Sequence, residues 1–292
     1  MLLDEGSTKK VDVDSPCSVY KWRSTSKASS HTHTHTHTVQ SSRVLYSCRA
    51  YIHHVRSGTN MSPVKVFGHP MLTNVARVML FLEEVGAEYE LVPVDFVAGE
   101  HKRPQHLQLN PFGQMPGFQD GDLVLFESRA IGKYIIRKYG ITAGLDLLGE
   151  NSGIEESAMV DVWTEVEDQQ YYPAISPVVF ECIINPFIMG GAATNQKVVD
   201  ESLERLKGVL GIYEARLEKS RYLAGDSISF ADLNHIPFTF YFMTTRHASV
   251  FDDYPKVKAW WESLMARPAV QRVCKYMPSQ FSCLLTTTPS IN

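Results

Sequence analysis

Glu127 and Ser128 stand where a short apolar run, Leu123 to Phe126, gives way to a helical pattern. Serine is a favoured N-cap residue, and the free N–H groups and positive dipole end of a helix N-terminus attract anions. The pair therefore offers hydrogen-bond donors to an anion. An ordinary cap beside an exposed acid would have the same sequence, so both interpretations stay open at this point.

Short strands and two helices must position this pair. Apolar runs predict strands at Val64 to Phe67, Tyr89 to Val94 and Leu123 to Phe126. Helical spacing predicts a helix from about Asn74, ended by Gly86, and another from Ser128 to Tyr139, ended by Gly140. This β-α-β order, followed by strands and a helix within about 80 residues, is typical of a thioredoxin-like domain.

After Gly144 the sequence becomes almost entirely helical. Helical patterns cover 154–170, 196–219, 230–245 and 257–266. We therefore expect an α/β thioredoxin-like N-terminal domain at 63–143, a linker at 144–153 and an all-α helical C-terminal domain at 154–292. Ser229 and Asp232 have the spacing of a capping box, which predicts a structural role.

Composition excludes several classes of function. Residues 1–60 carry eight Lys or Arg and four Asp or Glu, so the remainder carries 20 basic and 28 acidic side chains. An acidic body is a poor surface for nucleic acid or an anionic membrane. The five cysteines form no metal-ligand spacing, and no run of about 18 apolar residues predicts a membrane helix. A cytoplasmic protein without a bound metal is expected.

Residues 1–62 read as a disordered, low-complexity extension rich in Ser, Thr and His. His31 to Thr38 alternate strictly, as a translated CA-dinucleotide repeat would, so Met61 could be the usual start. An organelle-targeting extension is a second interpretation, although its acidic residues count against it. Metal binding by the histidines is a third.

Five strings resemble glutathione transferases of the plant phi class. They are 65–70 (KVFGHP), 99–102 (GEHK), 110–116 (NPFGQMP), 126–131 (FESRAI) and 229–233 (SFADL). The resemblance covers about residues 64–277. It implies an enzyme of detoxification and stress response that conjugates glutathione to hydrophobic electrophiles, with possible peroxidase activity. It also implies a homodimer.

The resemblance assigns glutathione contacts to individual residues. Ser128 and its backbone would bind the γ-glutamyl carboxylate, and Glu127 would meet the ammonium group. Met115-Pro116 would be a cis step that presents the Met115 backbone to the cysteinyl part, and Gln114 would bond the peptide. His101 and Lys102 would reach the glycyl carboxylate.

The activating residue departs from the family pattern. Phi enzymes usually place a serine two residues after the loop proline, where its hydroxyl stabilises the thiolate, but counting from Pro70 gives Leu72. Thr73 could supply the hydroxyl instead, with Asn74 as a weaker substitute. Alternatively, Thr73 only caps the helix, and backbone N–H groups hold the thiolate.

An apolar second substrate would contact Met71, Leu72 and Phe96 from the first domain and Tyr171 and Tyr172 from the second. The same residues could equally be plain core. Because Leu72 removes the usual hydroxyl, a second function is possible on this fold. The protein could carry planar hydrophobic ligands, flavonoid-like in shape, with little or no catalysis.

Overall fold

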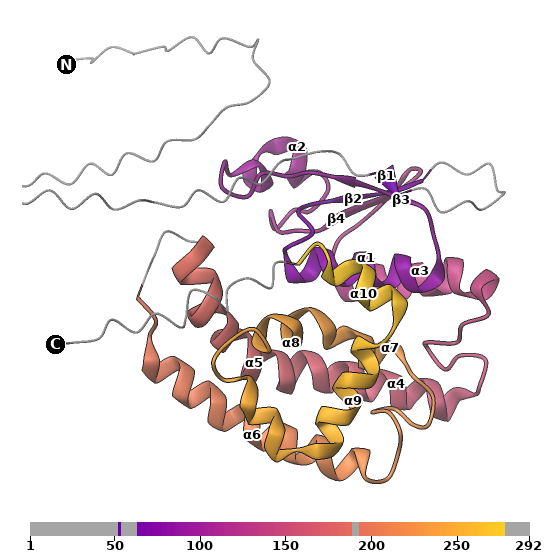
Figure 1. The fold of residues 1–292 in the computed structure, drawn as a ribbon. Coiled ribbons are helices and arrows are strands. Elements are labelled where there is room, and N and C mark those ends of the chain that lie inside the picture. Colours follow the sequence, from indigo (N-terminus) through magenta and orange to yellow (C-terminus); the bar gives the residue numbers. More distant parts are fainter. Residues whose placement is uncertain (1–51, 54–62, 189–192, 278–292) are drawn as a thin grey trace, which may run out of the picture. The chain divides into compact units, whose positions relative to one another are not determined.

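The computed structural model describes residues 52–53, 63–188 and 193–277 (Figure 1). Every described residue belongs to one compact unit, which lies within Ser47–Asn292. The His31 to Thr38 alternation lies outside the described residues.

A five-stranded sheet occupies the first part of this unit, in the order β1-β3-β2-β4-β5 (Figure 1). Its strands are β1 (Ile52–His53), β2 (Val64–Phe67), β3 (Tyr89–Val92), β4 (Gly117–Asp120) and β5 (Leu123–Leu125). β2 and β3 run parallel, whereas β4 pairs antiparallel with both β2 and β5. The predicted thioredoxin-like arrangement is confirmed.

Strand β1 was not expected, because it lies within the extension predicted to be disordered. Ile52 and His53 pair antiparallel with Glu90 and Tyr89 of β3. Without them β3 would form the edge of the sheet, and an edge strand offers unpaired N–H and C=O groups that another segment can bond. The pairing uses backbone groups, so side-chain patterning could not predict it.

Two helices, α1 (Thr73–Val85) and α3 (Ser128–Ala143), lie side by side against the sheet (Figure 1). α3 runs past Gly140, where the sequence predicted its end. Gly140 is buried, and a Cβ there would meet Ile136 and the Leu145 carbonyl at 3.4 Å, an ordinary contact distance. The helix ends instead at Gly144, whose φ of 67° is the left-handed conformation that glycine favours.

Helices form the rest of the chain. They are α4 (Ile154–Val166), α5 (Tyr172–Val179), α6 (Gln196–Leu217), α7 (Phe230–Asn234), α8 (Ile236–Phe242), α9 (Pro255–Met265) and α10 (Pro268–Cys274). Short helical turns also lie between β3 and β4, at η1 (Glu100–Lys102) and α2 (Pro104–Leu107), and before α9, at η4 (Ala248–Asp253). The all-helical second domain is confirmed.

Two of the predicted long helices are interrupted. The first passes into π-helical turns at Glu167–Tyr171 and again, after α5, at Phe180–Ile188. The second divides between α7 and α8 near Pro237, whose ring removes an N–H donor from the helix. The capping box at its start is present, since Asp232 accepts from both the N–H and the hydroxyl of Ser229.

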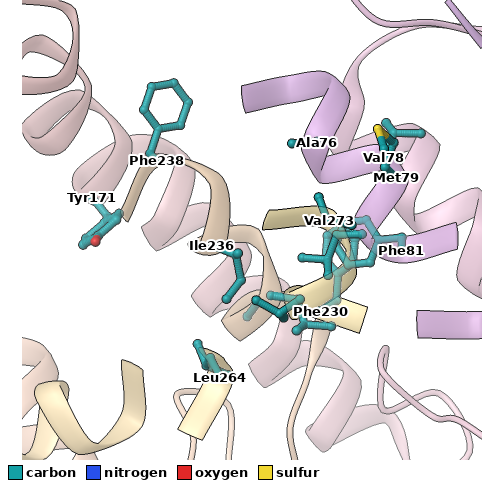
Figure 2. Packing of buried hydrophobic residues seen from close by; sticks show 14 of the residues in the cluster. Ala76, Val78, Met79, Phe81, Tyr171, Phe230, Ile236, Phe238, Leu264 and Val273 are labelled. Carbon is teal, nitrogen blue, oxygen red and sulfur yellow. The ribbon is translucent and has the colours of Figure 1, made fainter. Parts of the chain in front are cut away.

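The two domains share one apolar core. Figure 2 shows Phe81 of α1 beside Phe230 of α7 and Val273 of α10, and the two phenylalanine rings stack with centroids 4.6 Å apart. Gly132 of α3 permits this approach, because a Cβ there would lie 2.6 Å from Phe81 and 2.8 Å from Phe230. Arg267 also forms an ion pair with Glu84 across the junction.

The two cysteines in the described part of the chain are free thiols. Burial raises the pKa of Cys182, and it raises that of Cys274 to about 12. Over the same residues, no helix combines the length and apolarity needed to cross a membrane.

Candidate functional site

A polar cavity of about 190 Å³ opens where the two domains meet. It is lined by the start of α1, the loop before β4, the start of α3 and one residue of α5: Asn74, Asn110, Gln114, Met115, Pro116, Glu127, Ser128, Arg129 and Tyr172. The fold thus brings together seven residues that the sequence singled out, although they lie up to 98 positions apart in the chain.

The loop before β4 is held rigidly at the cavity. Met115-Pro116 is a cis peptide, as predicted. The carbonyl oxygen of Gln114 lies 2.7 Å from Nε2 of His106, and Asn110 donates to the carbonyl of Pro116 at 3.4 Å. These bonds fix the backbone of Met115 at the cavity wall.

The start of α3 differs in one respect from the prediction. Glu127, not Ser128, occupies the cap position, with a φ of 69° that L-residues seldom adopt. Ser128 is the first helical residue, and its hydroxyl oxygen accepts from Nη1 of Arg77 at 2.9 Å. The Ser128 proton can therefore point to a ligand, beside the free N–H groups of the first helical turn.

Buried charges lie beneath this helix start. Arg77 is fully buried and lies 3.5 Å from Glu167, which Arg129 also contacts at 2.7 Å. Arg129 reaches Asp168 at 2.8 Å as well. Burial lowers the pKa of Arg77 to about 10 despite Glu167. Burial alone would also lower the pKa of Arg129, but Glu167 and Asp168 outweigh it and raise that pKa. Both arginines therefore remain cationic near neutral pH.

His101 and Lys102 do not line the cavity, but they lie next to it. The ammonium group of Lys102 donates to the carbonyl of Phe112 at 3.0 Å and packs over Gly113, which precedes Gln114. The His101 ring stacks on Phe96 with centroids 4.6 Å apart. Desolvation, and then the charge of Lys102, lower the pKa of His101, so this ring is mostly neutral near pH 7.

The loop before α1 explains why Leu72 and Thr73 are poor donors. Leu72 occupies the N-cap position, its N–H donates to the His69 carbonyl at 2.9 Å, and its side chain packs against the core. Thr73 is the first helical residue, so it is not the cap that the sequence suggested, and it does not line the cavity. Tyr241 donates to the Met71 carbonyl at 2.6 Å and fixes the loop.

The two consecutive tyrosines predicted to face an apolar substrate have different environments. Tyr171 belongs to the buried apolar cluster (Figure 2). Its hydroxyl lies 2.6 Å from that of Thr239 and its ring stacks on Tyr213, so the prediction for it is wrong. It belongs to a π-helical turn, which changes the direction of side chains relative to an α-helix. Tyr172 does reach the cavity, with its ring 5.7 Å from the Arg129 guanidinium.

Two family models match the chain: the glutathione S-transferase N-terminal domain at residues 62–137 and the C-terminal domain at 171–268. The protein belongs to the glutathione S-transferase family. It is 89% identical over 223 residues to glutathione S-transferase 1 of Triticum aestivum, and this match covers 76% of this chain and 97% of that relative. It is 68% identical to the probable glutathione S-transferase GSTF1 of Oryza sativa subsp. japonica, over 75% of this chain and 99% of the relative.

A solved transferase agrees in fold. Glutathione S-transferase I from maize, in complex with an atrazine–glutathione conjugate, has 53% sequence identity and a TM-score of 0.69. The match covers 74% of this chain and 98% of that structure. Together with the rice and wheat relatives, this match supports membership of the plant phi class.

Sequence reasoning missed much of the transferase site's supporting polar network. Arg77, Arg129 and the pair Glu167-Asp168 were not predicted to have a role. Arg77 carries a detectable signal, because it is a single charge between Ala76 and Val78 on an otherwise apolar helix face. Across the residues described, no group of three or more His, Cys, Asp or Glu is arranged to hold a metal ion.

Proposed function

We propose that this protein joins the sulfur of reduced glutathione to hydrophobic electrophiles. In this reaction the S–H bond breaks and its proton passes to water, a bond forms between sulfur and the electrophilic carbon, and the leaving group departs with its electron pair. The observation that carries the proposal is the polar cavity between the cis peptide and the start of α3. The membership of the family supports the same reaction.

The cavity offers complementary groups to each part of glutathione. Its γ-glutamyl carboxylate would accept from Ser128 and the first N–H groups of α3, above the cationic Arg77 and Arg129. Its ammonium group would meet Glu127, and its cysteinyl backbone would pair with Met115. Gln114 would bond the peptide, and Lys102 and His101 would hold the glycyl carboxylate at the adjoining loop.

The electrophile would contact the apolar side chains nearest the expected thiol. Met71, Leu72 and Phe96 are all partly buried, and Tyr172 borders the cavity from the second domain. The maize relative is described with a glutathione conjugate of atrazine, a flat apolar molecule. We extend this to planar hydrophobic electrophiles here, and to hydroperoxides as a side reaction.

The proposal includes the assembly and location of the protein. We place the domain limits at 63–143 and 154–292, with a linker at 144–153. We expect a cytoplasmic homodimer in which the first domain of one subunit faces the second domain of the other, as the family resemblance implies.

The test uses the full chain. Conjugation of a chlorinated nitroaromatic with glutathione is measured across pH, and glutathione binding is measured by calorimetry. Binding with turnover is the expected result. Tight binding without turnover on this substrate or on a hydroperoxide would favour a carrier of planar ligands, and absence of glutathione binding would refute the assignment of the site.

A further inference from the structure

We propose that the side-chain amide of Asn74 donates the hydrogen bond that stabilises the glutathione thiolate in this protein. This proposal rests on the proposed function and deepens it. It assigns the activating role to a residue other than Leu72, which has no donor, or Thr73, which lies outside the cavity lining.

Asn74 is the residue of the first turn of α1 that lines the polar cavity. It shares the cavity wall with Met115, whose backbone is expected to bind the cysteinyl part of glutathione. A donor that lines the same cavity as Met115 can contact a cysteinyl group bound there. In the preceding segment, from His69 to Thr73, no residue lines this cavity.

The orientation of the Asn74 amide is fixed by chemistry. Its Oδ1 accepts a hydrogen bond from Nη1 of Arg77 at 2.7 Å. A guanidinium can only donate, so oxygen and not nitrogen must face Arg77. The NH₂ group consequently points away from Arg77, and within the described chain it has no hydrogen-bond partner. A cavity-lining donor without a partner is available to a ligand.

The anchor behind this amide is rigid. Arg77 has no exposed surface and also bonds Ser128 at 2.9 Å and the Asn234 carbonyl at 3.4 Å, in addition to its contact with Glu167. An amide whose oxygen is held by a cation is also polarised, which strengthens its N–H donors. Arg77 is thus a positioning residue for Asn74.

The backbone donors of the loop before α1 are occupied. The N–H of Leu72 is bonded to His69 at 2.9 Å, and the N–H of Met71 lies 3.3 Å from Nδ1 of the same residue. Thr73 makes no side-chain cap bond and does not line the cavity. Among the side chains near the expected thiol, Asn74 combines a free donor with access to the cavity.

Asn74→Ala is the deciding test, because it removes the N–H donor without adding a charge. Asn74→Asp also lacks the donor and keeps the size of the side chain, but its carboxylate would itself repel the thiolate, so its shift counts only beside that of Asn74→Ala. The readout is the pKa of the thiol of bound glutathione, titrated by ultraviolet difference absorbance of the thiolate in the full chain. A hydrogen bond to a charged group is worth enough to shift this pKa by about one to two units. We therefore expect Asn74→Asp and Asn74→Ala to raise it by at least about one unit. The acid limb of the pH profile of kcat/KM should move by the same amount.

Asn195→Asp is the matched control. It makes the same chemical change at an exposed helix cap whose acceptor role a carboxylate retains, and Asn195 does not line the cavity. Thr73→Val tests the competing donor, since it removes the only side-chain hydroxyl in the first turn of α1. Neither should move the thiol pKa by more than about 0.3 units, a factor of two in the equilibrium.

The role of Arg77 is tested by the same titration. Arg77→Met should raise the thiol pKa in a chain that has Asn74 and cause little further change in the Asn74→Ala background, because the two act as one unit. A purely structural arginine would lower the unfolding midpoint equally in both backgrounds without moving the thiol pKa.

An unchanged thiol pKa in folded Asn74→Asp and Asn74→Ala would overturn the proposal, as would an equal shift in Thr73→Val. The titration needs glutathione binding but no turnover. A wild-type protein that binds glutathione without conjugating it would therefore refute the proposed function and leave the test of Asn74 decisive.

Discussion

Glu167 provides the clearest test of the electrostatics beneath the cavity. It is almost fully buried between Arg77 and Arg129, at 3.5 Å and 2.7 Å. Changing it to Gln retains the shape and one carbonyl acceptor but removes the negative charge. Arg77 is sealed from solvent, and in the described part of the chain it contacts no carboxylate besides Glu167, so the substitution removes its main counter-ion.

The size of the effect follows from the pKa of Arg77. A decrease from 12.5 to about 10 means that burial already disfavours the charged form by roughly 3 kcal/mol, even with Glu167 present. Removing one partner of a buried ion pair typically costs about 3–5 kcal/mol. We expect Glu167→Gln to lower the free energy of unfolding by about that amount, a large part of the total stability of a typical domain.

Urea unfolding of the full chain measures this difference, at one protein concentration because any dimer would couple to unfolding. Glu165→Gln is the control: it lies on the same helical stretch, is exposed and should change stability by less than about 0.5 kcal/mol. If Glu167→Gln were no more destabilising than Glu165→Gln, Arg77 would not depend on this carboxylate and the reasoning would be refuted. Arg77→Met should also soften the effect of Glu167→Gln, because the stranded charge is then absent.

Three further outcomes are expected. Gly132→Ala should lower stability by about 1–3 kcal/mol, because the new methyl group meets two phenylalanine rings. The control, Gly208→Ala at an open, exposed helix position, should be neutral or stabilising by up to about 1 kcal/mol, and thermal unfolding measures both. Ser128→Ala should weaken glutathione binding by about tenfold or more in calorimetry, and Ser152→Ala, on an exposed loop, should leave it unchanged. Burial alone would raise the pKa of Asp120, but hydrogen bonds from one lysine and two tyrosines outweigh it and lower that pKa. Its stabilisation is therefore present above the usual pKa and lost as pH falls through the lowered one. Asp120→Asn should consequently lose less stability than wild type as the pH falls from about 5 to about 2.

Local sequence signals predicted the parts of the site that depend on neighbouring residues. The cis step at Met115-Pro116 and the cap at Ser229 both followed from strings of a few residues, and the structure confirms them. The strand and helix order also followed from short-range apolar periodicity.

What the sequence did not predict depends on contacts between distant segments. Gly140 was predicted to end the helix, but the chain stays helical to Ala143 and adopts the left-handed conformation only at Gly144. Tyr171 follows the apolar pattern of its neighbours, and only the π-helical turn decides that it faces the core. The bond between Arg77 and Ser128 joins residues 51 positions apart, which no local pattern encodes.

The covered thiols of Cys182 and Cys274 have a consequence for a protein that would handle alkylating compounds. A thiol reacts as its thiolate, and burial holds the pKa of both groups above the ordinary value. In the described chain, the sulfur atoms of the protein are therefore far less nucleophilic than a thiol activated in the cavity. An electrophile arriving there would be consumed by glutathione, and these two cysteines would be spared self-inactivation.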